Sequence, residues 1–416
     1  MDFNPDREPP AYSALSSSLP TNDEYLSIIE QSIDNLSNDL RTFSLKMFEY
    51  AETAMKEYHT HDLLADFMSQ QSGWKVTRHA YGMETAVEAV FSRGSGGPTI
   101  GFNSEMDALP QIGHACGHPL ICISGIAAAI ATATALTKAS LPGTVILLGT
   151  PAEEDIGGKL TLIDRGAYKP MDACLMLHPA PFGGLLGMFA ITEVIVEYHG
   201  KNAHAAGAPW EGVNALDAAV AAYTSISTLR QQIHPTHRVH GIIQGSERWT
   251  ANVIPDYACL KYGIRAPTSK EMLELKERVF NCFKAAALST GCTYTLKEEL
   301  VYYDLKNNSR LGTEYKHYME SVMKIPVPLT GPVLGSTDFG NVSYKVPAIH
   351  PIYEIPTKPG EGNHTRGFTT AAATEEAHEL TLKSAKGIAF TGWKVLSNPS
   401  FLADVRREFN LEICRT

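Results

Sequence analysis

The chain has 416 residues, of which 44% are hydrophobic and 19% are charged, so it can bury sizeable cores, lacks the composition of a disordered protein and is long enough for two structural units. Its formal net charge of −10, with no dominant run of Lys or Arg, excludes the electrostatic footprint of binding to nucleic acid or to an anionic membrane. Seven scattered cysteines are an odd number and predict reduced thiols rather than a disulfide scaffold.

The N-terminal segment, residues 1–22, is rich in Pro, Ser and Asp and is predicted to be a flexible leader. It has neither the basic start nor the apolar run of a signal peptide, and no later stretch is expected to reach membrane-spanning length. We therefore expect a cytoplasmic protein that does not bind membranes. Residues 23–71 carry apolar side chains at helical spacing, which predicts two amphipathic helices.

Residues 73–190 show a rhythm of strand, helix and strand. Short apolar runs and one Ala-rich, helix-favouring stretch produce it, at 85–91, 98–104, 120–137, 144–150 and 173–178. The strands end near polar residues, namely Glu105 and Asp107, Glu153 and Glu154, and His178. Because ligands of open α/β sheets gather outside the carboxyl ends of the strands, this placement predicts an active site.

The rest of the chain divides into an insert and a return to the first pattern. Residues 191–305 alternate strands and helices as an α+β domain does. Residues 306–416 then contain a Gly-rich turn, an apolar run, a Gly-rich loop and a final helix. The predicted fold class is α/β: a catalytic domain of residues 23–190 and 306–416, with a central mixed sheet flanked by helices, and an inserted α+β domain.

The segment HACGH places Cys116 and His118 two residues apart, in a Gly-containing turn just before a helix. A thiolate and an imidazole at this spacing can bind one soft or borderline cation, which also holds the thiol deprotonated. Alone, such a pair is more often a buried thiol beside a packed histidine. The pair needs support from other residues before it predicts a metal site.

Adjacent carboxylates give that support. Glu153 and Glu154 follow a run that should be buried, and a cation would relieve their repulsion, with one carboxylate binding metal and the other acting as a base. Solvated loops are the commoner explanation of such pairs. His178 lies at the end of the next strand and His364 in a Gly-rich loop, so together these residues predict a metal-dependent hydrolytic site.

At these residues the sequence resembles the M20 metallopeptidase and amidohydrolase family, in the branch of amidohydrolases and aminoacylase-like dipeptidases. The resemblance runs in family order from about Tyr50 to Phe368, and it is carried by YAETAMKEYHTHD, EMDALPQIGHACGHPL, GTPAEEDIGGK, LHPA, GKNAHAAGAPWEGVNALDA, HGIIQG, NVIPDYA, YGIRA, GSTDFGNVS and NHTRGF. Such collinearity is far more specific than any one motif.

The resemblance implies a zinc-peptidase-like catalytic domain with two divalent metal ions per subunit. Zinc is favoured, while manganese, cobalt or nickel also fit a mixed donor set. The implied ligands are Cys116, His118, Glu154, His178 and His364. Glu153 would be the general base, and Asp107 would support a ligand histidine and fix its tautomer.

The resemblance also implies that the insert is a lid and dimerisation domain of a homodimer. His204 would reach into the partner subunit's site and stabilise the oxyanion, and Asn252 and Arg265 would line the same cleft. Together with the loop around Thr337, they are the predicted substrate-binding residues.

Two features modify this interpretation. Pro119 follows His118 where many relatives carry Asp or Asn, so filling of both metal sites stays open. The loop PQIG before His114 is short, which resembles the dipeptidase-like branch.

The predicted function is hydrolysis of an amide bond in a dipeptide, an N-acyl amino acid or a related small metabolite. Three alternatives stay open: an enzyme that forms amides, a cysteine hydrolase with Cys116 as nucleophile, and a non-catalytic binding protein of the same fold.

Overall fold

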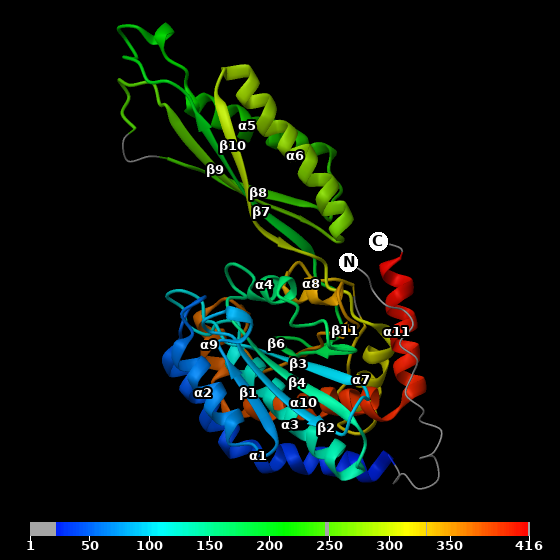
Figure 1. Cartoon of the computed structure of the whole chain (residues 1–416). Helices are drawn as coiled ribbons and strands as arrows, with labels where there is room; N and C mark the ends of the chain where they lie inside the picture. Colours follow the sequence, from blue (N-terminus) through cyan, green and yellow to red (C-terminus); the bar gives the residue numbers. More distant parts are fainter. Residues whose placement is uncertain (1–21, 246–248, 330, 415–416) are drawn as a thin grey trace. The chain divides into compact units, whose positions relative to one another are not determined.

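The computed structural model describes residues 22–245, 249–329 and 331–414 (Figure 1). Residues 1–21 of the predicted leader lie outside this range, and Asn22 begins the first helix. The described chain forms two compact units. Unit 1 comprises the described residues up to Leu186 together with 306–331 and 342–414, and unit 2 comprises Gly187–Leu305 and Pro332–Asn341.

Unit 1 is built on a six-stranded mixed sheet in the order β1-β2-β4-β3-β5-β11. The strands are β1 Trp74–Arg78, β2 Val87–Arg93, β3 Thr99–Glu105, β4 Gly143–Thr150, β5 Ala173–Leu175 and β11 Ala348–Ile349. β1, β2 and β4 pair antiparallel, whereas β4, β3, β5 and β11 run parallel. A separate parallel pair joins β6 His178–Ala180 to β12 Ile352–Glu354. The predicted central mixed sheet is confirmed.

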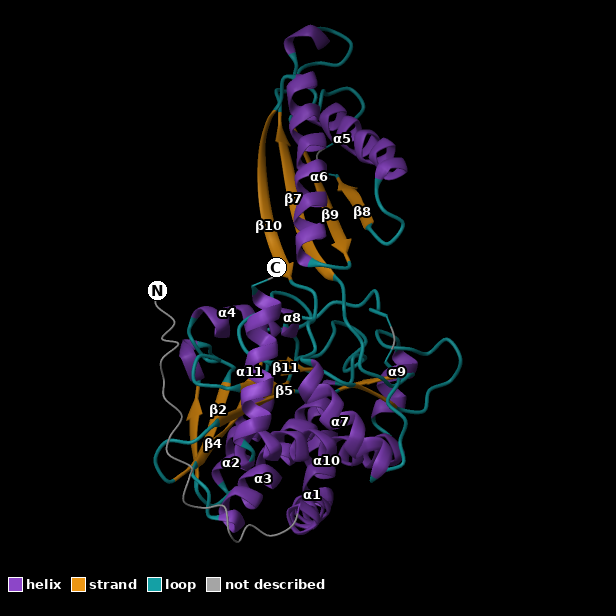
Figure 2. Cartoon of the chain, turned by 90° about the vertical axis from the view of Figure 1, so that its right-hand side faces the viewer, coloured by secondary structure: helices purple, strands orange, loops and turns teal. Residues whose placement is uncertain are grey.

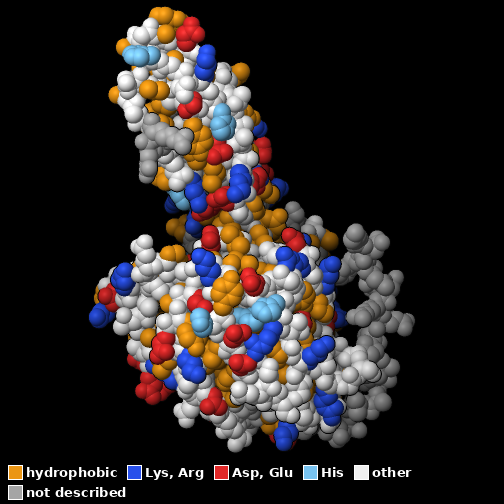
Figure 3. Space-filling model, turned by 60° about the vertical axis from the view of Figure 1, so that its left-hand side comes forward, with side chains coloured by type: hydrophobic (Ala, Val, Ile, Leu, Met, Phe, Trp, Pro, Cys, Tyr) orange, Lys and Arg blue, Asp and Glu red, His pale blue; other side chains and the backbone are white. Residues whose placement is uncertain are grey.

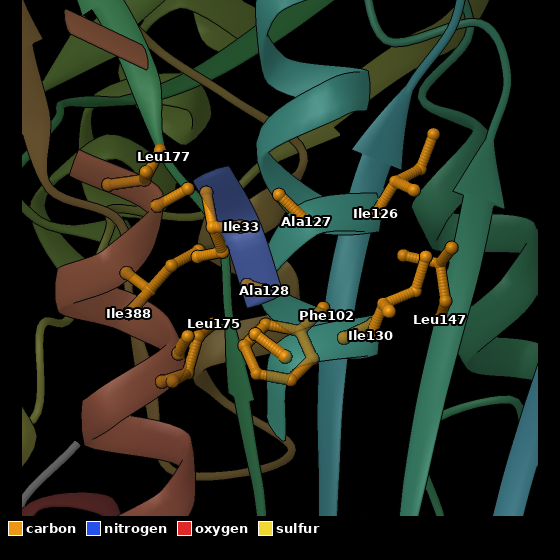
Figure 4. Close-up of a cluster of buried hydrophobic side chains, with 14 of the residues drawn as sticks. Ile33, Phe102, Ile126, Ala127, Ala128, Ile130, Leu147, Leu175, Leu177 and Ile388 are labelled. Atoms are coloured by element: carbon orange, nitrogen blue, oxygen red, sulfur yellow. The ribbon is translucent and has the colours of Figure 1, made fainter. Parts of the chain in front are cut away.

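Helices flank this sheet, as expected. They are α1 Asn22–Tyr50, α2 Tyr58–Ser69, α3 His118–Ala139, α4 Gly158–Asp164, α7 Ser309–Ser321, α9 Arg366–Ala372, α10 Glu375–Ser397 and α11 Pro399–Ile413. α3 packs against β3 and β4 and also contacts α1 and α10. Their shared core contains Phe102, Ile126 and Leu147, and Ile33 and Ile388 contribute to it from α1 and α10 (Figure 4).

α3 corrects one expectation about membrane-spanning length. This helix, His118–Ala139, is long and apolar enough to cross a membrane by length and composition, and it alone passes this test among the described residues. However, 89% of its most apolar 18-residue stretch is buried within the protein. A helix that is apolar on all faces is typical of a protein core, and α3 is such a core helix.

Two element predictions differ from the structure. The single strand predicted at 173–178 is split, because the chain leaves the large sheet after Leu175 and pairs with β12 from His178 onward. The single final helix is three helices, α9 to α11. The side chains of Thr374 and Asn398 accept hydrogen bonds from the first turns of α10 and α11, so each begins a new helix.

Unit 2 is a four-stranded antiparallel sheet in the order β10-β7-β9-β8, with two helices on one face (Figure 2). Its elements are β7 Ala190–His199, α5 Ala215–Leu229, β8 Arg238–Gln244, β9 Tyr257–Ala266, α6 Ser269–Thr290 and β10 Thr293–Tyr302, and α8 Phe339–Ser343 starts within it. Segment 332–341 joins unit 2, although the sequence-based boundaries placed it in the catalytic domain, because hydrogen bonds tie it to Phe189 and Arg265.

Candidate metal-dependent active site

The predicted metal ligands of unit 1 lie at strand ends and in the loops that follow them. Cys116 and His118 stand at the start of α3, Glu154 follows β4, His178 begins β6, and His364 lies before α9. Figure 3 shows histidine side chains beside acidic side chains on one face of this unit. The edge of the sheet therefore collects the donors that the sequence spreads over some 250 positions.

Gly117 allows the turn between Cys116 and His118. Its φ of 84° lies in the left-handed region. A Cβ at this position would also lie 2.6 Å from Pro179 Cγ. Only glycine fits there, so the turn can pass beside β6 and bring both donors towards His178.

Among the described residues, three overlapping groups of side chains each bring their donor atoms within 4.8 Å of one another. They are Cys116, His118 and His178; Cys116, Glu154 and His364; and Glu105, His118 and Glu153. Cys116 Sγ is 3.3 Å from His178 Nε2, and His364 Nε2 is 3.4 Å from Glu154 Oε1. His118 Nε2 is 3.8 Å from Glu154 Oε1 and 3.9 Å from Glu153 Oε2. All five predicted ligands are thus brought together.

The second nitrogen of each of two histidines is held by a fixed oxygen. Asp107 Oδ1 lies 3.3 Å from His118 Nδ1, and His178 Nδ1 donates to the carbonyl of Pro179 at 2.9 Å. The hydrogen bond on His178 Nδ1 fixes the tautomer of that ring, so that its Nε2 lone pair faces the donor groups. The contact of Asp107 with His118 Nδ1 is at ion-pair distance.

Asp107 also shapes the turn that carries the two glutamates. Its carboxylate accepts from the backbone N–H of Glu153 at 3.1 Å and of Glu154 at 3.0 Å. One oxygen of Glu57 accepts from the N–H of Ala152 at 2.9 Å. Ala152 itself has a φ of 58°. Three successive amides are therefore fixed by two buried carboxylates.

Charge is concentrated in this site. Burial alone would lower the pKa of His118, but Asp107 and Glu105 raise it well above its usual value. Burial works against ionisation of Glu105, yet Lys159, with His118 and His178, lowers its pKa to about 2. Burial, with Glu154, raises the pKa of the Cys116 thiol. A cysteine nucleophile and a cysteine metal ligand both act as the thiolate, so Cys116 needs a bound cation or another positive group to ionise here.

Several buried atoms of the donor set have no hydrogen-bond partner in the described part of the chain. His118 Nε2, Glu105 Oε2 and Glu154 Oε1 are buried and have no hydrogen-bond partner among the described residues. Leaving such atoms unpaired is costly. One thiol, three imidazoles and carboxylates are ligand types that zinc and related ions accept, so these residues fit a divalent metal.

Sequence reasoning did not assign roles to four residues near the donors. Glu105 ends β3, Lys159 lies in α4 and bonds to Glu105, and Glu57 precedes α2. His350 follows β11, with its ring 5.5 Å from that of His178. All four are buried polar groups. Only Glu105 carried a usable signal, since it stands two residues before Asp107 at a predicted strand end.

The predicted residues of unit 2 lie in two separate places. His204 is exposed, and its Nδ1 accepts from the N–H groups of Ala206 at 3.2 Å and Gly207 at 2.9 Å. The proton of the neutral ring is therefore on Nε2, which is free to act as a donor. Asn252 lies beside it, because its carbonyl accepts from the N–H of Ala205 at 2.9 Å.

Arg265 and Thr337 lie at the other end of β9. Arg265 Nη1 donates to the carbonyl of Leu334 and to Ser336 Oγ, both at 3.0 Å. The hydroxyl of Thr337 accepts from the N–H of Phe339 at 3.2 Å, and this residue is buried. Eight strand positions separate Tyr257 from Arg265, or roughly 26 Å. One copy of unit 2 thus does not bring Asn252 and Arg265 into one cleft.

Comparisons with known proteins agree with this geometry. Residues 186–290 match a family model described as Peptidase dimerisation domain. The chain is 43% identical over 398 residues to the Xaa-Arg dipeptidase of Mus musculus, covering 92% of this chain and 91% of that protein. It is 41% identical over 404 residues to the Xaa-Arg dipeptidase of Homo sapiens, again covering 92% and 91%.

A solved structure supports the fold. A dinuclear metal-binding peptidase of the M20 family from Bacillus subtilis matches with a TM-score of 0.64 and 19% identity, covering 87% of this chain and 99% of that one. At this identity the likeness concerns the fold.

Proposed function

The chain belongs to the M20 family of peptidases and amidohydrolases and is a metal-dependent hydrolase of carbon–nitrogen bonds, and from this we propose that it cleaves dipeptides with a C-terminal arginine. Support comes from the convergence of five donor side chains beside Glu153 in a chain with 43% identity to an Xaa-Arg dipeptidase. Lysine at the same position of the dipeptide is the closest chemical substitute.

We propose two divalent ions per subunit, with zinc as the favoured metal. Cys116, His118, Glu154, His178 and His364 would hold them. When bound, divalent ions supply Lewis acidity, which polarises a carbonyl group and lowers the pKa of a water molecule. The thiol and the three imidazoles favour zinc over hard cations such as magnesium.

Glu153 is the proposed general base and later the general acid. Its side chain is 10% exposed and stands at the edge of the donor cluster. The carboxylate takes a proton from the attacking water and delivers it to the amine that leaves the scissile bond. Asp107 acts through the backbone, because it fixes the turn that orients this carboxylate.

His204 is the proposed oxyanion donor, acting from the unit 2 of a second copy in a homodimer. Its Nδ1 accepts from two backbone amides, so the proton of the neutral ring is on Nε2. A neutral imidazole N–H can donate to the oxyanion of the tetrahedral intermediate. Asn252 lies before the start of β9 and Arg265 near its end, and this separation also favours a cleft that two copies complete.

The substrate proposal is tested with a dipeptide panel. Ala-Arg, Ala-Lys, Ala-Glu, Ala-Leu, N-acetyl-Arg and p-aminobenzoyl-glutamate would be compared by kcat/KM with the zinc-loaded protein. We expect Ala-Arg and then Ala-Lys to be cleaved fastest, with free arginine or lysine as a product. Equal rates on Ala-Leu and Ala-Arg would contradict the proposed selectivity.

We also propose that the protein functions in the cytoplasm. All seven cysteines are free in the structure, as reducing conditions require. Imaging of a fluorescent fusion to the whole chain tests this, and signal confined to an organelle would contradict it.

A further inference from the structure

Glu105 and Lys159 form a buried ion pair beside the proposed metal ligands. Both residues are 0% exposed, and Lys159 Nζ donates to Glu105 Oε1 at 2.6 Å. Transfer of two charges out of water is costly, and apolar residues of similar volume often replace such a pair without loss of stability. The mechanism above gives neither residue a role.

The second oxygen of Glu105 faces the donor cluster. Oε2 is buried and has no hydrogen-bond partner among the described residues, and it lies 3.4 Å from His118 Nε2. Glu105 also groups with His118 and Glu153 as possible ligands of one ion. Two atoms that each bind zinc at about 2.1 Å lie roughly 3.4 Å apart in a tetrahedral site. The observed separation of 3.4 Å matches the one expected for two ligands on one ion.

We propose that Glu105 is an additional metal ligand through Oε2, and that Lys159 is the positioning residue that holds Oε1 and turns Oε2 towards the ion. The inference rests on the proposed metal site. The ammonium group also limits the negative charge that Glu105, Glu153 and Glu154 together bring to the site. Lys159 lies on α4 and Glu105 on β3, so the pair also joins the two loops that carry the donors.

Glu105→Gln separates this role from a purely structural ion pair. The amide oxygen still accepts from Lys159, but the amide NH₂ then faces the ion and cannot bind it. We expect zinc affinity, measured by competition with a chromophoric chelator, to fall at least tenfold. The visible absorption of the cobalt-loaded variant should also differ from that of the cobalt-loaded wild type. Unchanged zinc affinity and an unchanged cobalt spectrum would overturn the proposal.

Two further variants guard against loss of folding. Glu105→Leu combined with Lys159→Met removes both charges together and should preserve the fold, yet it should lose as much zinc affinity as Glu105→Gln. Lys386→Met is the matched control, because Lys386 pairs with Asp34 at 2.7 Å between α10 and α1. It should bind zinc as the wild type does.

Each outcome has a distinct meaning. A double variant that folds and binds zinc with wild-type affinity overturns the role of Glu105 but leaves the proposed function intact. A wild-type protein that binds no zinc, manganese or cobalt would overturn both proposals.

Discussion

In unit 1 the predicted site residues are mostly buried and face one another. In unit 2, His204 and Asn252 are exposed and lie in loops, and the His204 ring bonds to backbone amides of its own loop. The donors of unit 1 include buried atoms without a hydrogen-bond partner among the described residues, such as His118 Nε2 and Glu154 Oε1, and these fit the proposed divalent ions. In unit 2, His204 instead presents one free N–H. One chain thus supplies a full set of metal donors, whereas in the proposed homodimer the oxyanion donor comes from a second copy.

The largest expected effect comes from Glu153→Gln in unit 1. Loss of the general base should lower kcat by about 10³-fold while metal content stays the same. Glu154→Gln is the matched comparison at the neighbouring proposed ligand, because it should lower metal content as well as activity. Turnover is measured with Ala-Arg, and metal by elemental analysis. A Glu153→Gln variant with wild-type kcat would remove Glu153 from the mechanism.

His204→Ala tests the contribution of unit 2 to catalysis. We expect kcat to fall about 10²-fold, because the oxyanion loses a hydrogen-bond donor. Metal content should stay the same, because His204 is not one of the proposed metal ligands. Mixed refolding with Glu153→Gln subunits then tests the second copy.

In such a mixture, each hetero-dimer has one site with both changes and one with neither. Activity should return to about a quarter of the wild-type value, since about half of the dimers are mixed and each has one intact site. No recovery would show that His204 acts within its own chain.

Glu57→Gln tests how the glutamate turn is held. Burial, together with Asp107, raises the pKa of Glu57 to about 7. Since the folded-state pKa lies above the unfolded value of 4.5, the contribution of Glu57 to stability is fully present below pH 4.5 and is lost as the pH rises through 7. The glutamine of the variant cannot ionise. The difference in free energy of unfolding between variant and wild type should therefore shift by roughly 2 to 3 kcal/mol in favour of the variant between pH 5 and pH 8. Denaturant unfolding at several pH values measures the difference, and parallel curves would refute it.

The smallest expected effect comes from a change in unit 2 that should leave the zinc site of unit 1 unaffected. The side chain of Asn214 accepts from the N–H of Leu216 at 3.0 Å and caps α5. Asn214→Ala should cost about 1 kcal/mol of stability, without a change in zinc affinity. Thermal unfolding and chelator competition would be compared, and a weaker zinc site would show coupling between the units.

Much of the site of unit 1 could be predicted from local sequence. Apolar runs that end in acids marked Glu153 and Glu154, and the C-x-H spacing marked Cys116 and His118. These signals work because the carboxyl ends of parallel strands meet at one edge of a sheet.

Long-range partners had no comparable signal. Lys159 and Glu105 are 54 positions apart, and no spacing rule links them. Segment 332–341 belongs to unit 2 only through hydrogen bonds to distant residues. The split of the final helix was visible in principle, because Thr374 and the Asn398–Pro399 pair are helix-start signals inside a helical pattern.

We propose that unit 1 holds two divalent ions that dipeptide hydrolysis requires. The most direct test removes all metal by chelation and returns zinc in steps, while bound zinc per chain and turnover of Ala-Arg are followed together. We expect activity to vanish in the metal-free protein and to recover in full as binding approaches two ions per chain. Full activity in the metal-free protein would contradict the account.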